Sequence, residues 1–258
     1  MNKKGAHVLK IALTFDVERD LPNVLDTHFG IDAGLSRILE MLENFDIKGT
    51  FFCTGNVVER FPERIKSIEQ KGHEIACHGL NHERLSQLSF DECKEIISQS
   101  KEVVEHICKK SKIIGFRAPY LSPPKFLFKV LNKLGFKYDS SIKSRKNLKY
   151  YQINGYQIQE FHPSDYNVFL RFPLSYTFLR KWIFKKKLIV LYFHPWEAIN
   201  VKNLLRNHKN RTDFLKNIVF RPDRWLNTGD SFLRRISKLI KEAISKKAEF
   251  VTLNQLIV

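Results

Sequence analysis

The chain is organised around residues 73–85, which read His73-Glu-Ile-Ala-Cys-His78-Gly-Leu-Asn-His82-Glu-Arg-Leu85. A short apolar run predicts a buried strand over 74–77, and His78 stands at the C-terminal end of that strand. His82 follows four residues later, and residues four apart lie on one face of a helical turn, so both imidazoles can reach one metal ion. Alone, this spacing is a weak signal, because a solvated histidine pair at the start of a helix gives the same pattern.

Strands and helices alternate along the rest of the chain. Apolar runs predict strands over 8–15, 49–54, 74–77, 112–116, 136–138, 188–193 and 249–253. Capping residues and apolar spacing predict helices over 32–45, 57–70, 89–110, 124–134 and 231–247, and Ser89-Phe-Asp-Glu92 is a capping box at the start of the third. The alternation predicts an α/β fold with a parallel sheet, either a closed β/α barrel or an open doubly wound sheet, in one domain over 1–258. Within it we expect residues 143–187 to be an irregular, basic insertion with short strands near 156–161.

Ionisable side chains follow directly on five of the expected strands, namely Asp16, His78, Arg117, Asp139 and His194. In a closed β/α barrel the C-terminal ends of all strands open on one face, and active sites lie there. The five groups are therefore expected to converge. This convergence strengthens the interpretation of the two histidines as metal ligands.

The residue types in this set suit metal-assisted hydrolysis of an amide or ester. Two neutral imidazoles and one carboxylate make a divalent site with an open position for water, the usual arrangement of catalytic zinc. Asp16 and Glu18 can supply a ligand and a general base, and His194 can act as the acid toward the leaving group. Arg117 can orient a carboxylate through a bidentate pair, and Asp139 can orient His194 and raise its pKa.

Several ordered motifs between residues 11 and 197 carry a resemblance to a known family. They are Thr14-Phe-Asp-Val-Glu18, Thr50-Phe-Phe52 with Gly55, His78-Gly-Leu-Asn-His82, Arg117-Ala-Pro-Tyr120, Tyr138-Asp-Ser-Ser141 and Phe193-His-Pro-Trp196. In these motifs the chain resembles the polysaccharide deacetylases, the NodB or chitooligosaccharide-deacetylase homology group also called carbohydrate esterase family 4. The resemblance implies a distorted (β/α)7 barrel and a metal-dependent hydrolase that deacetylates a glycan.

The resemblance also implies roles for individual residues of the metal site and base. Asp16 matches the catalytic base, and Arg117 matches the arginine that orients it. His78 and His82 match ligands of a divalent metal, usually zinc and sometimes cobalt or nickel.

Further roles follow from the motifs on the opposite side of the expected site. The backbone N–H of Tyr120 matches an oxyanion-hole donor, His194 matches the general acid, and Asp139 matches the carboxylate that tunes this acid. Trp196 can stack on a sugar as a substrate-binding residue, or it can belong to the core.

One position departs from the family pattern. The usual first motif has two adjacent aspartates, of which the second binds the metal, but Val17 stands there in this chain. An apolar side chain cannot bind metal, and Glu18 is one residue further on and longer. Some relatives with an Asp-x-Asp or Asp-x-Glu version bind metal through the later carboxylate, so the resemblance implies Glu18 as the third ligand with His78 and His82. Alternatively, Asp16 binds the metal and the base lies elsewhere, or the protein works without metal, as some ureide-hydrolysing relatives do.

The composition bears on partners and location. Lys and Arg number 44 against 27 Asp and Glu, which gives a net charge of +17 and favours anionic partners such as lipid-phosphate-linked glycans. The basic and aromatic stretch 178–187 can contact an anionic membrane surface, although it can also be a loop that feeds the strand over 188–193. No nucleic-acid-binding motif and no signal peptide are recognised, so we expect no specific nucleic acid and a cytoplasmic, at most membrane-peripheral, location.

The leading hypothesis is therefore an N-deacetylase that acts on an acetamido sugar of a surface polysaccharide or of its lipid- or nucleotide-linked precursor. A hydrolase of a non-sugar amide, such as a cyclic ureide, uses the same residue types. A glycan-binding protein that has lost catalysis is the alternative from another class, and the replacement at Val17 is the feature that raises it.

Overall fold

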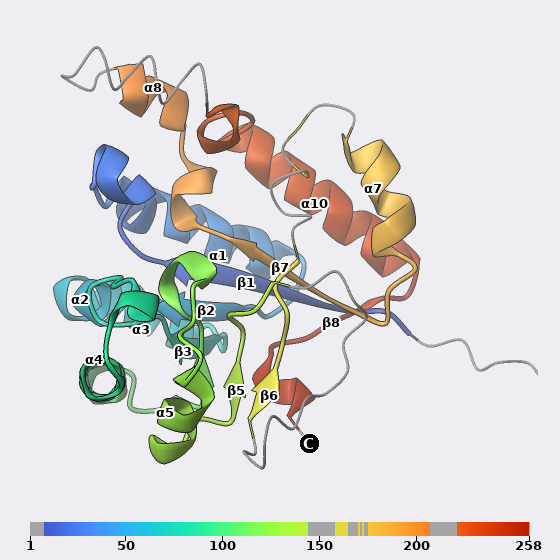
Figure 1. Cartoon of the computed structure of the whole chain (residues 1–258). Helices are drawn as coiled ribbons and strands as arrows, with labels where there is room; N and C mark the ends of the chain where they lie inside the picture. The colour runs from blue at the N-terminus through green and yellow to red at the C-terminus, as the bar shows by residue number, and fades with distance from the viewer. Residues whose placement is uncertain are drawn as a thin grey trace, which may run out of the picture.

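A parallel sheet forms the centre of the computed structural model, which describes residues 8–143, 158–164, 170, 172, 175–206 and 221–257. Within these ranges the strand order is β6-β5-β4-β3-β2-β1-β7, and β8 pairs with β1 beside this path (Figure 1). The strands are β1 (Lys10–Val17), β2 (Thr50–Cys53), β3 (Glu74–Cys77), β4 (Gly115–Phe116), β5 (Tyr138–Asp139), β6 (Gln159–Glu160), β7 (Leu188–Phe193) and β8 (Glu249–Phe250).

The sheet curves into an incomplete barrel. The residues after β6 return to β7, where Pro163 and Val190 form an isolated parallel bridge and the Ser164 N–H donates to the Val190 carbonyl at 2.8 Å. Because β4, β5 and β6 contain only two residues each, this side of the ring is held by few ladder hydrogen bonds. The expected distorted (β/α)7 barrel is confirmed, and the open doubly wound alternative is wrong.

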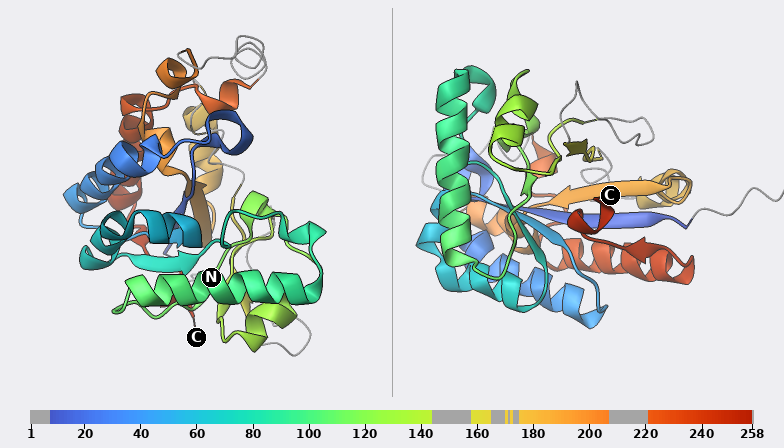
Figure 2. Two further views of the ribbon diagram at one scale, coloured as in Figure 1. Left: turned by 90° about the vertical axis from the view of Figure 1, so that its left-hand side faces the viewer. Right: turned by 90° about the horizontal axis from the view of Figure 1, so that it is seen from below.

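Helices lie outside the strands, as both views of Figure 2 show. They are α1 (Leu35–Asn44), α2 (Gly55–Arg60), α3 (Pro62–Gln70), α4 (Phe90–Ile107), α5 (Leu127–Lys133), α7 (Ser175–Ile183), α8 (Val201–Arg206) and α10 (Asp230–Ser245). The expected capping box of α4 is confirmed, because the Glu92 N–H donates to the Ser89 hydroxyl and the Ser89 N–H donates to the Glu92 carboxylate. Among the described residues, no helix has both the length and the apolar character needed to cross a bilayer.

The single helix expected over 57–70 is instead two helices, α2 and α3. The break falls at Phe61, whose backbone angles are φ −126° and ψ 51°. Pro62 causes it, because a proline ring disfavours the helical conformation of the residue before it. Proline itself is well accommodated in the first turn of α3.

The region 143–187 is not irregular throughout, which corrects the expectation. It contains β6 and the helix α7, while residues 144–157, 165–169, 171, 173 and 174 lie outside the described ranges, as do the first two residues of the strands expected over 156–161. In α7 the side chains of Phe178 and Trp182 are 71% and 64% exposed. Contact of this face with an anionic membrane stays a prediction.

Alternation along β1 separates the inside of the barrel from the outside. Odd-numbered residues from Ile11 to Val17 belong to the large apolar cluster that also contains helix residues such as Ile38. The even-numbered Ala12 belongs to a second cluster of strand, loop and C-terminal residues. Successive side chains of a strand point to opposite faces, so Asp16 points into the barrel with Ala12.

Polar contacts between strands hold the interior below the expected site. The Tyr138 hydroxyl donates to Glu74 at 2.8 Å, and Thr50 donates to the other oxygen of that carboxylate at 2.7 Å. The Tyr138 ring crosses Gly115 so closely that a Cβ there would lie 1.9 Å from a ring carbon. Only glycine at position 115 therefore allows this packing.

His73 is a buried histidine at the other end of β3, away from the cluster of strand-end groups. Its Nδ1 accepts a hydrogen bond from the Gly49 N–H at 3.2 Å, and its ring lies 5.2 Å from the Phe51 ring, measured between centroids. Burial, helped by the charges of Lys48 and Lys71, lowers the pKa of His73 to about 4. The folded protein therefore keeps this ring neutral at mildly acidic pH.

We predict that His73 makes the fold sensitive to acid. Between its ordinary pKa of 6.5 and about 4, the unfolded chain binds a proton that the folded chain does not, so stability falls as the pH decreases through this window. In a His73→Gln variant the loss of unfolding free energy between pH 7 and 4.5 should be smaller by about 2–3 kcal/mol, measured by urea denaturation. The exposed His106→Gln is the matched control, and an unchanged pH dependence in His73→Gln would contradict the prediction.

Candidate active site

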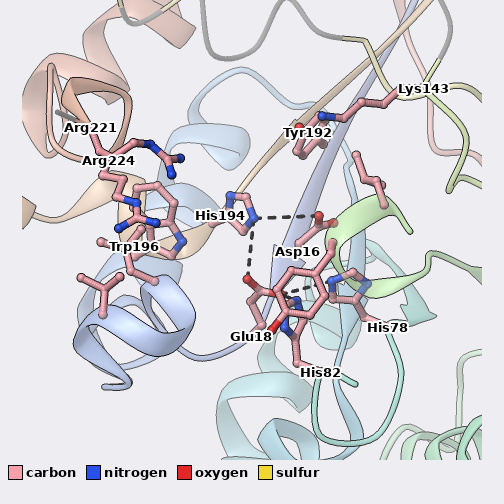
Figure 3. Close-up of a pocket in the computed structure, with 14 residues that line it drawn as sticks. Asp16, Glu18, His78, His82, Lys143, Tyr192, His194, Trp196, Arg221 and Arg224 are labelled. Atoms are coloured by element: carbon pink, nitrogen blue, oxygen red, sulfur yellow. Dashed lines mark hydrogen bonds and ion pairs between the residues drawn. The ribbon is translucent and has the colours of Figure 1, made fainter. Parts of the chain in front are cut away.

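A cavity of about 350 Å³ opens at the C-terminal ends of the strands (Figure 3). Its lining includes most of the side chains that the sequence singled out, namely Asp16, Glu18, His78, His82, Tyr120, His194 and Trp196. Arg117 and Asp139 stand behind this lining, fully buried. The expected convergence of side chains from the strand ends is therefore present.

Glu18, His78 and His82 come together at the bottom of the cavity. The Nε2 atom of His78 lies 3.2 Å from Oε2 of Glu18, and Nε2 of His82 contacts the same oxygen. The ligand atoms of the three residues all lie within 4.8 Å of one another, and all three side chains are buried. This is a compact N, N, O donor set.

The protonation of this donor set fits a bound cation. The Arg117 carbonyl lies 2.8 Å from Nδ1 of His78, and because a carbonyl only accepts, Nδ1 carries the proton. When a metal ion is bound, Nε2 of the neutral ring can offer it a lone pair beside the Glu18 carboxylate, and without the ion a proton on Nε2 makes the hydrogen bond to Glu18. Hydrogen-bonded histidines oriented in this way are typical of zinc ligands.

The charge of Glu18 agrees with a ligand role. Burial by itself raises the pKa of this carboxyl, but hydrogen bonds from His78 and His82 and the charges of His82 and His194 outweigh it and hold the pKa well below its usual range. Two imidazoles and an ionised carboxylate suit Zn²⁺, and also Co²⁺ or Ni²⁺. The residues present therefore fit the expected divalent metal.

The two histidines converge through a loop and not through a helical turn, which corrects the expectation. Gly79 and His82 both have positive φ, 77° and 62°, so the chain reverses sharply between the two imidazoles. The Gly79 carbonyl fixes the loop, because it accepts from the Gly55 N–H at 3.0 Å and from the Ser100 hydroxyl at 2.7 Å. Long-range contacts thus replace the local helical geometry.

The alternation of β1 explains how the site tolerates Val17. Val17 is fully buried among the outer apolar residues, facing the helices. Asp16 and Glu18 lie two positions apart and therefore point to the same face, into the cavity. Glu18 contacts His78 and His82, whereas Asp16 forms an ion pair with Arg117.

Arg117 holds Asp16 from behind. Its Nη1 donates to Oδ1 of Asp16 at 2.6 Å and to the Thr14 hydroxyl at 2.8 Å, while Nε and Nη2 donate to the carbonyl and hydroxyl of Ser140. The contact with Asp16 uses one nitrogen, so the expected bidentate pair is not formed. The guanidinium also lies over the Phe52 ring, 4.0 Å from its centroid. Oδ2 of Asp16 is left facing the cavity.

His194 faces the two carboxylates across the cavity. Its Nε2 lies 3.8 Å from Oε1 of Glu18 and 4.0 Å from Oδ2 of Asp16, as the dashed lines of Figure 3 show. Its ring stacks on Trp196 at 5.1 Å between centroids, and Trp196 both lines the cavity and packs in an apolar cluster. Trp196 thus lines the cavity and also belongs to the core, which are the two possibilities that the sequence left open.

Glu197, to which the sequence assigned no role, orients His194. Its Oε1 lies 3.2 Å from Nδ1 of His194 and accepts from the His194 backbone N–H at 3.1 Å. Burial alone lowers the pKa of His194, but the hydrogen bond with Glu197 and the charges of Glu18 and Asp16 raise it overall. The sequence contains one signal for this contact, because Glu197 follows His194 by three residues, which is the spacing of a capping box.

Asp139 does not occupy the expected position beside His194. Its two oxygens accept from the N–H and hydroxyl of Ser141 at 3.1 Å and 2.7 Å. Burial, together with the neighbouring carboxylate of Glu160, raises the pKa of Asp139 well above its usual range. Within the described residues, Asp139 accepts hydrogen bonds from Ser141, whereas Glu197 contacts the ring of His194.

The loop that Asp139 supports carries Tyr120. The Ser141 hydroxyl accepts from the Ala118 N–H at 2.7 Å, which ties residues 117–120 to the end of β5. Tyr120 has a left-handed backbone with φ 59°, and its ring packs 4.4 Å from the His82 ring, measured between centroids. The role of its N–H as an oxyanion donor stays a prediction.

The family model described as polysaccharide deacetylase matches residues 3–138, more than half of the chain. The peptidoglycan deacetylase of Helicobacter pylori is 28% identical over 123 residues, which cover 48% of this chain and 42% of that protein. The chain spans less than half the length of each of several curated relatives that it matches.

Solved structures share the whole fold. A Mycobacterium smegmatis protein assigned to the polysaccharide deacetylases is 23% identical with a TM-score of 0.66, covering 98% of this chain and 96% of that one. The PuuE allantoinase is 13% identical with a TM-score of 0.70, covering 98% and 90%. At these identities the likeness shows the fold alone.

We predict that Glu18, and not Asp16, completes the metal site. Glu18→Gln should lower zinc affinity more than about 100-fold, because it removes a charged ligand, whereas Asp16→Asn should keep about one zinc per chain. Competition with a chromophoric chelator and elemental analysis measure both quantities. Glu95→Gln, on the exposed face of α4, is the control. Loss of zinc from Asp16→Asn with retention in Glu18→Gln would assign the ligand to Asp16 instead.

Proposed function

Because the chain belongs to the polysaccharide deacetylase family, we propose that it is a metal-dependent hydrolase that removes N-acetyl groups from an acetamido sugar. Its substrate is a surface polysaccharide or the lipid- or nucleotide-linked precursor of one. The observation that carries the proposal is the Glu18, His78 and His82 donor set in one cavity with Asp16 and His194. These groups provide a metal site, a base and an acid within reach of a single amide.

The residues of the chain divide the chemistry between them. Zinc held by Glu18, His78 and His82 would polarise the acetamide carbonyl and lower the pKa of a bound water. Asp16, fixed through Oδ1 by Arg117, accepts the proton of the attacking water at Oδ2, which faces the cavity.

His194 completes the reaction from the opposite wall. Its Nε2 donates a proton to the sugar nitrogen as the C–N bond breaks, so that water is added across the amide and acetate and a free amine are released. Glu197 at Nδ1 holds the ring with Nε2 toward the carboxylates and favours its protonated form. Asp139 and Ser141 position the Arg117–Tyr120 loop, where the predicted oxyanion donor lies.

Two alternative functions remain distinguishable. Hydrolysis of a cyclic ureide is consistent with the fold shared with an allantoinase, and turnover of a ureide but not of acetylated sugars would favour it. A glycan-binding protein without catalysis is disfavoured by Glu18, because it supplies the carboxylate that Val17 cannot. Failure to bind added zinc would restore the binding-only alternative.

We expect the zinc-loaded protein to release acetate from N-acetylglucosamine-containing glycans. A His78→Ala, His82→Ala double variant should lose zinc and at least about 100-fold in kcat/KM, since both the metal and its charge stabilisation disappear. Acetate release is followed by a coupled assay, and metal content by elemental analysis. His106→Ala, an exposed histidine on α4, is the control. Absence of acetate from every acetylated glycan, with zinc bound, would refute the proposal.

Glu197 is predicted to be a positioning residue for His194. Glu197→Gln should lower kcat by roughly 10–100-fold while KM and zinc content stay close to those of the unchanged protein, because it acts on the acid and not on substrate or metal. Glu197→Asp should recover part of the rate. A steady-state comparison of the three proteins decides the matter, and an equal fall in zinc content would point to a merely structural role.

A further inference from the structure

The cavity has cationic side chains along its outer part. Lys143, Arg221 and Arg224 all line it, whereas its lining carboxylates, Asp16 and Glu18, lie at the bottom with Arg117 and the histidines. Figure 3 shows both arginines on the Trp196 side and Lys143 beside Tyr192, with His194 between the two sides. The positive groups thus flank the space above the metal site.

We propose that these side chains form an anion subsite that selects acetamido sugars bearing a phosphate or carboxylate group. The inference rests on the proposed function and names its substrate class. With the acetamide at Glu18 and His194, the remainder of the sugar extends toward the cationic rim. A group with two or more anionic oxygens is the ligand that adjacent guanidinium groups bind best, through paired charge-assisted hydrogen bonds.

The two arginines belong to a turn that is connected to Glu197. Arg221 precedes the short 3₁₀ turn Pro222–Arg224 and Arg224 is its last residue, and the Arg224 N–H donates to the Arg221 carbonyl at 3.0 Å. A few residues later, the Gly229 N–H donates to the Glu197 carbonyl at 2.8 Å. The segment that carries the arginines is therefore tied directly to the residue that orients His194.

An apolar cluster fixes the same segment. Trp225, which follows Arg224, packs in the cluster that contains Trp196 and Leu21. Trp196 and Leu21 also line the cavity. The cluster thus joins the arginine turn to the cavity wall, so the positive charges are held at one side of the cavity rather than on a separate surface.

Lys143 supplies positive charge from the opposite wall. It follows the Ser140–Ser141 segment that contacts Arg117 and Ala118, and its Nζ lies 6.0 Å from the centroid of the Tyr192 ring. Aromatic rings on both walls, Trp196 and Tyr192, provide apolar faces for a sugar ring. The cavity therefore combines sugar-sized aromatic walls with a cationic rim.

The test compares neutral and anionic substrates in the zinc-loaded protein. The panel is an N-acetylglucosamine trisaccharide, N-acetylglucosamine 1-phosphate, UDP-N-acetylglucosamine and N-acetylmuramic acid. Arg221→Gln with Arg224→Gln should lower kcat/KM for the preferred anionic sugar at least about tenfold, mainly through KM, and leave the neutral trisaccharide within about twofold. Arg64→Gln with Arg234→Gln removes the same charge outside the cavity and is the control.

The substrates in the panel distinguish a phosphate from a carboxylate as the group that the subsite recognises. A larger loss for the phosphate-bearing sugars identifies phosphate, and a larger loss for N-acetylmuramic acid identifies carboxylate; either supports the subsite. Equal turnover of neutral and anionic sugars, unchanged in the double variant, would overturn it.

A binding measurement keeps this inference separate from the proposed function. Calorimetric titration with pyrophosphate should show at least about tenfold weaker binding to the Arg221→Gln, Arg224→Gln protein than to the unchanged protein and the control. If no sugar is hydrolysed but this difference is found, the proposed function fails and the subsite stands. If acetate is released and pyrophosphate binding is equal in all three proteins, the subsite fails and the function stands.

Discussion

The two-residue period of β1 is the constraint on which the other features depend. This strand is paired on both sides and buried along nearly its whole length, so each of its side chains must face either the helices or the barrel interior. Apolar residues at the odd positions secure the helices, and the even positions carry Asp16 and then Glu18 into the cavity. A register shift by one residue would bury both carboxylates among the helices, where unpaired charge is very costly.

A fully buried arginine connects this strand with the rest of the barrel. Removing a guanidinium from water is unfavourable unless its donors are satisfied and its charge is balanced. Arg117 meets both conditions through contacts with Asp16 and Thr14 on β1 and with Ser140 after β5, while its carbonyl orients His78. One residue thereby sets the positions of Asp16 and of His78, and its own position depends on three strands being correctly assembled.

Two carboxylates illustrate how environment divides roles between similar groups. Glu197 lies beside a histidine and is its hydrogen-bond partner, so it favours positive charge on His194. Asp139 lies beside the carboxyl of Glu160, which together with burial raises the pKa of Asp139, and its oxygens accept hydrogen bonds from Ser141. The position of His194 therefore depends on the turn after β7, and the position of the Arg117–Tyr120 loop depends on the end of β5.

The sequence by itself determined the alternation of strands and helices, the capping box of α4 and the motifs at the strand ends, all of which are local patterns. It predicted His78 and His82 as metal ligands from their spacing after a strand, and Glu18 through the family resemblance. Only the tertiary structure decided that a loop pinned by Gly55 and Ser100 brings His82 to His78, and that Glu197 replaces Asp139 beside His194. It alone also brought Lys143, Arg221 and Arg224 to one cavity. The physical reason is that local periodicity carries no information about contacts between segments far apart in the chain. It also cannot decide which of two carboxylates, Asp139 or Glu197, lies beside His194.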